Sequence, residues 1–204
     1  MARVLSLTGA RIRELDIESD DNMDRDPQGV SGAVFQGMSY MDLSHCCDAF
    51  HGIRKVTMIV DGDCIGGWMT GNLVKILSGA TNLEKMCFSG TRISPVSPKY
   101  VFGTTTWSHL TSLSFVNVDF DQGELLDLLR RHSGILKDIC LFGVCLRNGS
   151  WRVLLEGMKS SLSLEAISID GPCEEGNKGY VIDIYVRPAA LTDYLLGDGP
   201  HPLR

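Results

Sequence analysis

Apolar residues recur along the chain in one spacing, apolar-x-x-apolar-x-apolar. This spacing begins at Ile53, Leu83, Leu110, Leu136 and Leu164, at intervals of 30, 27, 26 and 28 residues. A further copy, Ile12-x-x-Leu15-x-Ile17, lies 41 residues before the copy at Ile53. The period is close to the roughly 20–29 residues of leucine-rich repeats, in which each unit has a strand followed by a helix or 3₁₀ turn.

The segments between these strand-like runs have the period of an α-helix. Three apolar helical faces are predicted, made by Met69, Leu73, Ile76 and Leu77, by Leu125, Leu128 and Leu129, and by Trp151, Leu154, Leu155, Met158 and Leu162. Asp121 followed by Glu124 predicts a helix start, and Gly134 predicts a helix stop. Asn148-Gly149-Ser150 predicts a turn in which the serine caps the next helix.

These patterns predict an α/β fold, an irregular leucine-rich-repeat-like solenoid of about six strand units. We expect a parallel sheet on one face and short helices on the other, in a single domain over residues 1–204. An acidic loop insertion is expected at about residues 18–30, and a C-terminal tail at about residues 188–204. A doubly wound sheet also alternates strands and helices. The regular strand spacing and the lack of a glycine-rich phosphate turn after the first strand disfavour it.

Period-2 alternation sends the residues between the apolar positions to the opposite face of the sheet. We expect this face to be concave and to bind a partner protein, as such faces of solenoids do. An unoccupied, solvated sheet would carry a similar set of residues. The candidate binding residues are Glu14, Asp16, Glu18, Lys55, Thr57, Lys85, Cys87, Ser112, Ser114, Asp138, Cys140, Phe142, Ser168 and Asp170.

The composition narrows the classes of partner. Hydrophobic residues make up 44% of the chain and charged residues 22%, with a net charge of -6, which is ordinary for a soluble globular protein. The negative charge disfavours nucleic acid, whose phosphates require a basic face, and no apolar run is long enough to span a membrane. The acidic insertion is expected to be a solvated loop; a second interpretation is that it steers a basic partner.

The seven cysteines are odd in number and irregularly placed, with Cys87, Cys140 and Cys145 inside strand-like runs. A disulfide framework is therefore not expected, and the cytoplasm or nucleus is the predicted location. The N-terminal segment contains arginines and no acidic residue before Glu14, which is also typical of a mitochondrial presequence. The repeat spacing that begins at Ile12 favours a structural unit instead.

Three short motifs approach known sites and fail on spacing. Residues 171–179 nearly form a phosphate-binding loop, but Lys178 is one place late, and Glu174 and Glu175 would repel phosphate. His45, Cys46, Cys47 and His51 could bind zinc only if the adjacent cysteines reached one ion, which most backbones prevent. Residues 61–67 begin like a calcium loop and lack its later acids. We therefore expect no cofactor and no metal.

The run from about Leu110 to Ile169 resembles the C-terminal repeats of the F-box/leucine-rich-repeat proteins of filamentous fungi. The pieces that carry the resemblance are LTSLSFVNVDF, ELLDLLRRHSGILKDICLFGVCL, GSWRVLLEGM and SLSLEAISI, and the ending with Asp193, Tyr194, Gly199, Pro202 and Leu203. The resemblance is strong over roughly the last half and weak over the first. It implies a substrate-recruiting subunit of a cullin-type ubiquitin ligase, in which the F-box binds a Skp-type adaptor and the repeats bind the target.

No F-box start of the Leu-Pro-x-Glu type is visible, so the resemblance assigns adaptor binding to no residue of this chain. A Skp-type adaptor is expected only if an F-box lies upstream. The leading hypothesis is a protein-protein interaction module, the target-recognition part of an F-box-type ligase adaptor. The alternative is a stand-alone or truncated repeat scaffold without ligase coupling. An enzyme is the remote third hypothesis, because no catalytic constellation is found.

Overall fold

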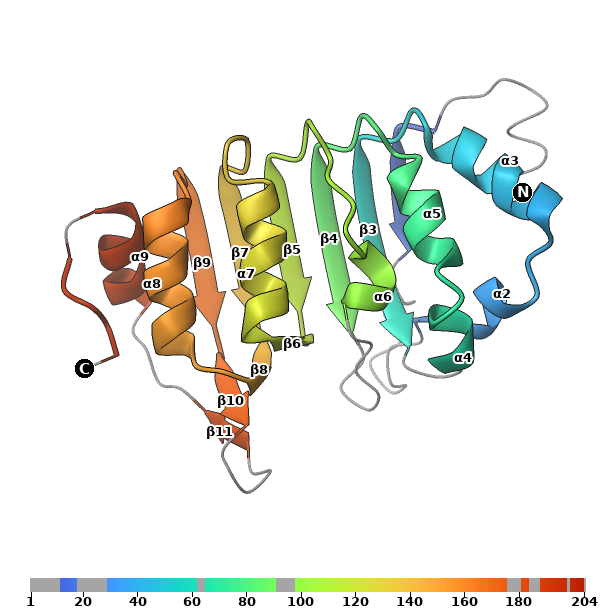
Figure 1. The fold of residues 1–204 in the computed structure, drawn as a ribbon. Coiled ribbons are helices and arrows are strands. Elements are labelled where there is room, and N and C mark those ends of the chain that lie inside the picture. Colours follow the sequence, from blue (N-terminus) through green and yellow to red (C-terminus); the bar gives the residue numbers. More distant parts are fainter. Residues whose placement is uncertain are drawn as a thin grey trace.

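The structure of the protein is a computed structural model that describes residues 12–17, 29–61, 65–90, 98–175, 181–183, 188–197 and 199–203. It is a mixed α/β fold with a mostly parallel sheet and helices (Figure 1). The main path of the larger sheet follows the order of the chain. It runs through β1 (Glu14–Ile17), β3 (Lys55–Asp61), β4 (Lys85–Gly90), β5 (Ser112–Val116), β7 (Asp138–Phe142) and β9 (Ala166–Asp170), with β2 (Val30–Ser31) paired to the end of β3.

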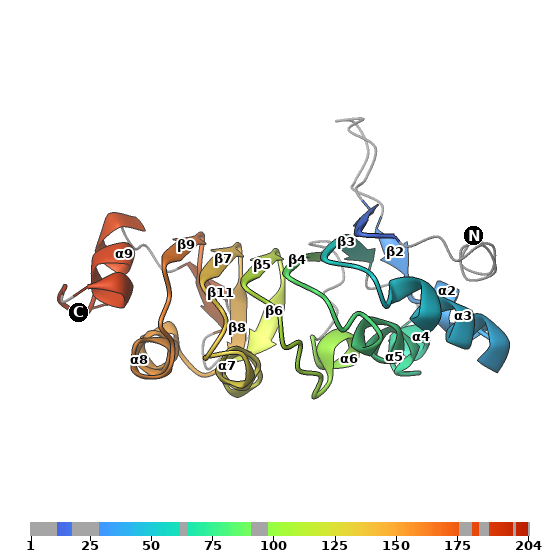
Figure 2. The same ribbon diagram turned by 90° about the horizontal axis from the view of Figure 1, so that it is seen from above.

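Helices α2 to α8 gather on one side of this sheet. The described helices are α2 (Ala33–Gln36), α3 (Tyr40–Phe50), α4 (Ile65–Trp68), α5 (Asn72–Ser78), α6 (Lys99–Phe102), α7 (Gln122–Arg131), α8 (Trp151–Ser161) and α9 (Pro188–Leu196). Figure 2 shows α5 to α8 below the sheet and α9 at its far end, beside β9. Within the described residues, the opposite face of the sheet carries no helix.

The predicted strands are confirmed, and alternation explains their burial. In β3, Val56, Met58 and Val60 are buried toward the helices, and the residues between them are only partly buried. The same alternation holds in β4 and β5. The apolar positions of the spacing therefore form one face of the sheet, and hydrophobic burial against the helices stabilises it.

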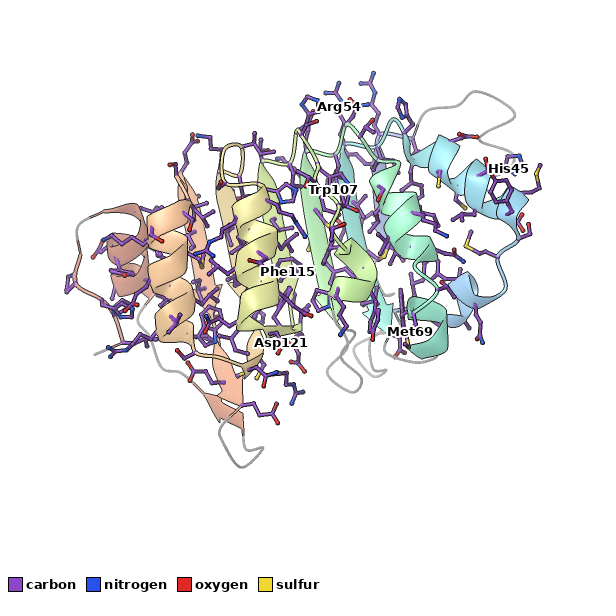
Figure 3. The ribbon with its side chains drawn as sticks, in the orientation of Figure 1. His45, Arg54, Met69, Trp107, Phe115 and Asp121 are labelled. Atoms are coloured by element: carbon purple, nitrogen blue, oxygen red, sulfur yellow. The ribbon has the colours of Figure 1, made fainter. Side chains whose placement is uncertain are left out.

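Aromatic side chains fill the centre of the core, where the helical layer is thinnest. The Phe102 ring from the single turn of α6 lies edge-on to Phe88, Phe115 and Trp107, with ring centroids 5.3, 5.5 and 6.2 Å apart. Phe115 also contacts Phe120 at 4.8 Å. Trp107 and Phe115, both buried, are labelled in Figure 3. Edge-to-face pairs of this kind add to the area that the rings bury.

A second, smaller sheet was not predicted. It contains β6 (Asp119–Asp121), β8 (Cys145–Asn148) and β10 (Cys173–Glu175) in parallel, with β11 (Val181–Asp183) antiparallel to β10. Its parallel strands each follow a strand of the larger sheet after a corner in the left-handed region, at Asn117 (φ 51°), Gly143 (φ 60°) and Gly171 (φ 56°). Segments of three or four residues are too short to show period-2 alternation, which explains why the sequence pattern does not reveal them.

One local prediction is corrected, and the structure adds detail to two others. The helix expected through Met69 is two helices, because Gly71 is left-handed at φ 69°, and the Met69 side chain is 60% exposed rather than on the apolar face. Helix α7 does begin after Asp121, but the Asp121 carboxylate accepts a hydrogen bond from the Asn148 side chain instead of capping the helix. The expected C-terminal tail contains α9, whose Leu191 and Tyr194 are buried.

Two other local predictions are confirmed. The Ser150 hydroxyl accepts a hydrogen bond from the Val153 amide at 3.3 Å and so caps α8. Helix α7 ends at Arg131, three residues before the predicted stop at Gly134. Boundary differences of this size are usual between sequence patterns and hydrogen-bonded helices.

His132 is buried beneath the loop that follows α6. Its Nε2 accepts a hydrogen bond from the Trp107 amide at 3.0 Å, and its Nδ1 lies 2.9 Å from the Leu128 carbonyl oxygen, to which it donates. The imidazole ring stacks on the Trp107 indole, with centroids 5.7 Å apart. Burial lowers the pKa of His132 below its usual 6.5, against the opposing effect of the Leu128 hydrogen bond. The neutral ring is therefore the form that the fold contains.

We expect acid to weaken the fold through His132. Because its folded-state pKa is depressed, its contribution is present above the unfolded-state value of 6.5 and is lost as the pH falls below it. Urea unfolding measured from about pH 8 to about pH 5, where histidine titrates, should show a smaller loss of stability in His132→Gln than in the wild type. The exposed His109→Gln variant is the control. Equal pH dependence in the wild type and His132→Gln would contradict this role.

Trp151 provides a second test of the packing. Its side chain is 1% exposed, and its indole Nε1 donates to the Cys173 carbonyl at 2.9 Å. We expect Trp151→Ala to lower the free energy of unfolding by about 3–5 kcal/mol, as truncation of a buried aromatic does. Val153→Ala, on the solvent side of the same helix, should change it by less than about 0.5 kcal/mol. Urea unfolding followed by far-UV circular dichroism measures the stability of both variants. Equal unfolding midpoints for Trp151→Ala and Val153→Ala would show that the buried face of α8 is misplaced.

Candidate interaction face

The candidate site is the face of the larger sheet opposite the helices, here called the open face. Because the strands pair in register, its side chains form three rows across the sheet. The first row contains Glu14, Lys55, Lys85, Ser112, Asp138 and Ala166; the second contains Asp16, Thr57, Cys87, Ser114, Cys140 and Ser168; the third contains Ile59, Ser89, Val116, Phe142 and Asp170. All the predicted binding residues lie on it except Glu18, which falls outside the described residues.

The first row is charged, and its charges are not all matched. The Lys55 ammonium lies 3.9 Å from the Glu14 carboxylate, and the Ser112 hydroxyl donates to Asp138 at 3.0 Å. Lys85 is the direct register partner of Lys55, and among the described residues no carboxylate pairs with it. Like charges directly opposite on paired strands destabilise a sheet. An anionic group placed over Lys55 and Lys85 would relieve that repulsion.

The second and third rows differ in shape and polarity. The second row is built mainly of short side chains, Thr57, Cys87, Ser114, Cys140 and Ser168, so it leaves room for another chain to approach the sheet. In the third row the Phe142 side chain is 44% exposed, beside Val116 on one side and Asp170 on the other. An exposed aromatic residue is typical of a contact that holds a partner.

The edge where the strands begin carries charges that are already paired. Arg54, labelled in Figure 3 at the upper edge of the sheet, lies 3.2 Å from Glu84, and Lys137 lies 3.0 Å from Glu165. These side chains are largely exposed, so the pairs contribute little stability. Their pairing also leaves this edge with less unmatched charge than the open face has at Lys85.

Two hollows lie away from the open face. A cleft of about 140 Å³ between α6 and α7 is lined by Lys99, Glu124, Asp127 and Arg131. Burial lowers the pKa of Arg131, with Asp127 opposing the effect. The cleft is smaller than the several hundred Å³ usual for a ligand site. A wider groove of about 510 Å³ at the strand starts is lined by Glu84, His109 and Lys137, but its acid and its lysine are both engaged in ion pairs.

The near phosphate loop has another structural role. Cys173 to Glu175 form β10, and the Glu174 carboxylate accepts a hydrogen bond from the Trp151 amide at 2.6 Å, at the N-terminus of α8. Glu175 lies 3.5 Å from Arg147, which also pairs with Asp119. Residues 176–180 lie outside the described part of the chain. The Glu174 carboxylate thus lies at the N-terminus of the preceding helix α8, an end that favours negative charge.

The other two motifs lie in and beside regular elements, the zinc-like one at α3 and the calcium-like one at the end of β3. His45, Cys46 and Cys47 are successive residues of α3, so their side chains point about 100° apart around its axis. Cys47 Sγ contacts the Lys75 carbonyl, and His51 Nδ1 lies 3.4 Å from Thr81 Oγ1. No group of three metal-binding side chains comes together among the residues that the structure describes. In the calcium-like segment, Asp61 ends β3 and residues 62–64 lie outside the described residues.

Sequence reasoning named Lys55 and Lys85 as candidates but missed that they are neighbours. The signal was present in the interval of 30 residues between the two copies of the spacing, which sets one lysine opposite the other when the strands pair. It also missed the cluster of Arg147, Asp119 and Glu175, because that cluster lies on the second sheet.

Comparisons with known proteins add no family to this geometry. No protein-family model, no curated protein and no solved structure matches the chain. None of the described helices is both long and apolar enough to cross a membrane.

Proposed function

We propose that the chain is a protein-binding module that holds its target on the open face. The observation that carries the proposal is a parallel sheet with helices on one face and none, in the described residues, on the other. Parallel sheets are usually covered on both faces. This bare face carries short polar residues, an exposed phenylalanine and Lys85, with which no carboxylate pairs among the described residues, so it is suited to being covered by another chain.

The same proposal includes an irregular leucine-rich-repeat-like solenoid with this face as its binding side. Its support is the recurrence of one unit, a strand, a left-handed corner and a return through a helix. The corners of successive units are linked by backbone hydrogen bonds. The Asn117 amide donates to the Phe142 carbonyl and the Gly143 amide donates to the Asp170 carbonyl, both at 2.8 Å. Units that each bury their apolar face against the next are the physical basis of solenoids.

The surface favours a target segment that is acidic at one end and apolar at the other. Lys55 and Lys85 lie in the first row, and Phe142 lies in the third row, two strands away. A carboxylate over the lysines gains charge-assisted contacts, and an apolar side chain against Phe142 buries ring surface.

The resemblance to fungal F-box/leucine-rich-repeat proteins gives the proposal a biological setting. In that setting the open face is the target-recognition part of a ubiquitin-ligase adaptor, and the Skp-type adaptor binds through an F-box that no residue here provides. The second candidate is a stand-alone or truncated repeat scaffold without ligase coupling. Mass spectrometry of proteins co-captured with the endogenous full-length product distinguishes the two, because a Skp-type adaptor should accompany only the first.

We expect Lys85→Glu to weaken capture of the bound protein by about tenfold or more, which corresponds to about 1.4 kcal/mol. Reversing the charge turns attraction for an acidic segment into repulsion, and Lys85 is partnered by no carboxylate whose loss would disturb the described fold. The matched control is Lys99→Glu, the same charge change at an exposed residue of α6 on the helical side. Capture is measured by quantitative affinity purification, with far-UV circular dichroism to confirm the fold. Weaker capture by Lys99→Glu together with normal capture by Lys85→Glu would contradict the proposal, because it would show that the partner binds the helical side.

A further inference from the structure

Two thiols face each other on the second sheet, away from the open face. Cys145 of β8 and Cys173 of β10 are direct register partners on adjacent parallel strands. Their side chains are hydrogen-bonded to each other, and Cys173 Sγ also lies 3.7 Å from the Val144 carbonyl oxygen. Paired strands lie about 4.8 Å apart, within the roughly 4.4–6.8 Å between Cα atoms that a disulfide requires.

We propose that Cys145 and Cys173 are an oxidation site, at which the two thiols join in a reversible intramolecular disulfide. The strands are already held in position by the hydrogen bond from the Cys173 amide to the Val144 carbonyl, at 3.0 Å. The bond therefore requires side-chain rotation rather than movement of the backbone.

The arrangement selects this pair among the cysteines that the structure describes. Cys87 and Cys140 share a row of the open face, but β5 lies between their strands, which separates them by about 9.6 Å at the usual strand spacing. Cys46 and Cys47 are adjacent in α3, where their side chains diverge around the helix axis. Only Cys145 and Cys173, within the described part of the chain, occupy facing positions on neighbouring strands.

The order of the steps follows from exposure. Cys145 is buried and Cys173 is only partly buried, so an external oxidant reaches Cys173 first. With a small disulfide such as glutathione disulfide, the Cys173 thiolate attacks one sulfur, the S–S bond of the oxidant breaks, and one glutathione leaves as the thiol after taking a proton. The Cys145 sulfur, having given its proton to water, then attacks Cys173 and releases the second glutathione. Two protein thiols are oxidised, and one disulfide is reduced to two thiols.

The second step is expected to be slow at neutral pH. Burial raises the pKa of the Cys145 thiol, and its hydrogen bond with Cys173 raises it further. Because the thiolate is the nucleophile, attack by Cys145 accelerates as the pH rises. A mixed disulfide on Cys173 should therefore accumulate first and then decay to the intramolecular bond.

The bond would fasten helix α8 and strand β9 to the second sheet. Helix α8 and strand β9 lie between Cys145 and Cys173 in the chain, so the bond closes a loop around them. The indole of Trp151 donates to the Cys173 carbonyl, which places a fluorescent reporter beside the site. Closing a loop in this way restricts the unfolded chain and raises resistance to denaturant.

The test treats the folded full-length chain with glutathione disulfide and follows intact mass, then maps disulfide-linked peptides. We expect a loss of two hydrogens, a dominant peptide that joins Cys145 to Cys173, and full reversal by dithiothreitol. Cys87→Ser should behave as the wild type, and Cys173→Ser should give no intramolecular bond. The wild type oxidised in urea is a further control, because pairing without the fold should give mixed connectivities.

Two results would overturn the proposal. One is a folded wild type that carries glutathione adducts without ever losing two hydrogens. The other is a linked peptide that joins other cysteines in the folded chain as readily as Cys145 and Cys173. A readout that needs no variant is urea unfolding of the reduced and oxidised wild type, followed through tryptophan fluorescence. Oxidation should raise the midpoint, and an unchanged or lower midpoint would show that the native strands do not accommodate the bond.

Discussion

One hydrogen-bond arrangement at the start of each strand fixes the register on which the rest of the structure depends. A single carbonyl oxygen accepts from two successive amides of the next unit: Arg13 from Arg54 and Lys55, at 2.7 and 3.1 Å. The same fork recurs at Arg54, Glu84, Thr111 and Lys137. A slip of one residue would exchange the two faces of a strand. The forks therefore place the apolar residues against the helices and the polar residues on the open face at the same time.

The helical layer is less regular than the larger sheet. Between β4 and β5 the described connection contains only the single turn of α6, yet the core stays filled because Phe102 and Trp107 place large rings where a longer helix would contribute aliphatic side chains. His132 completes this region, because its Nε2 accepts a hydrogen bond from the Trp107 amide and its Nδ1 donates to the Leu128 carbonyl. The imidazole is therefore buried with both of its hydrogen bonds satisfied. A regular sheet can thus accept units of unequal length, provided that the space above each strand is filled.

The sequence was sufficient for the strands of the larger sheet, and for nearly all residues of the open face, because period-2 alternation and a regular interval are both local signals. It was insufficient wherever a few residues act through tertiary contacts. Gly71 divides a helix whose apolar spacing looks continuous, and the strands of the second sheet are too short for any pattern. From the sequence, Glu174 could be read only as a charge that repels phosphate. Its hydrogen bond with the Trp151 amide depends on the tertiary contact between β10 and the start of α8. The pairing of Lys55 with Lys85 likewise required the register and not only the strands.

The order of the strands also determines how stability is distributed along the molecule. In the larger sheet each central strand is hydrogen-bonded on both sides. Within the described part of the chain, β1 is paired with β3 alone, and the outer side of β9 is packed by α9. Local opening costs least where neighbours are fewest. Amide protons should thus exchange fastest at the β1 end and slowest in β4, β5 and β7. Among the described residues the two ends of the sheet are physically unequal: α9 packs against β9 at one end, and at the other end β1 leaves an edge with which another strand can pair.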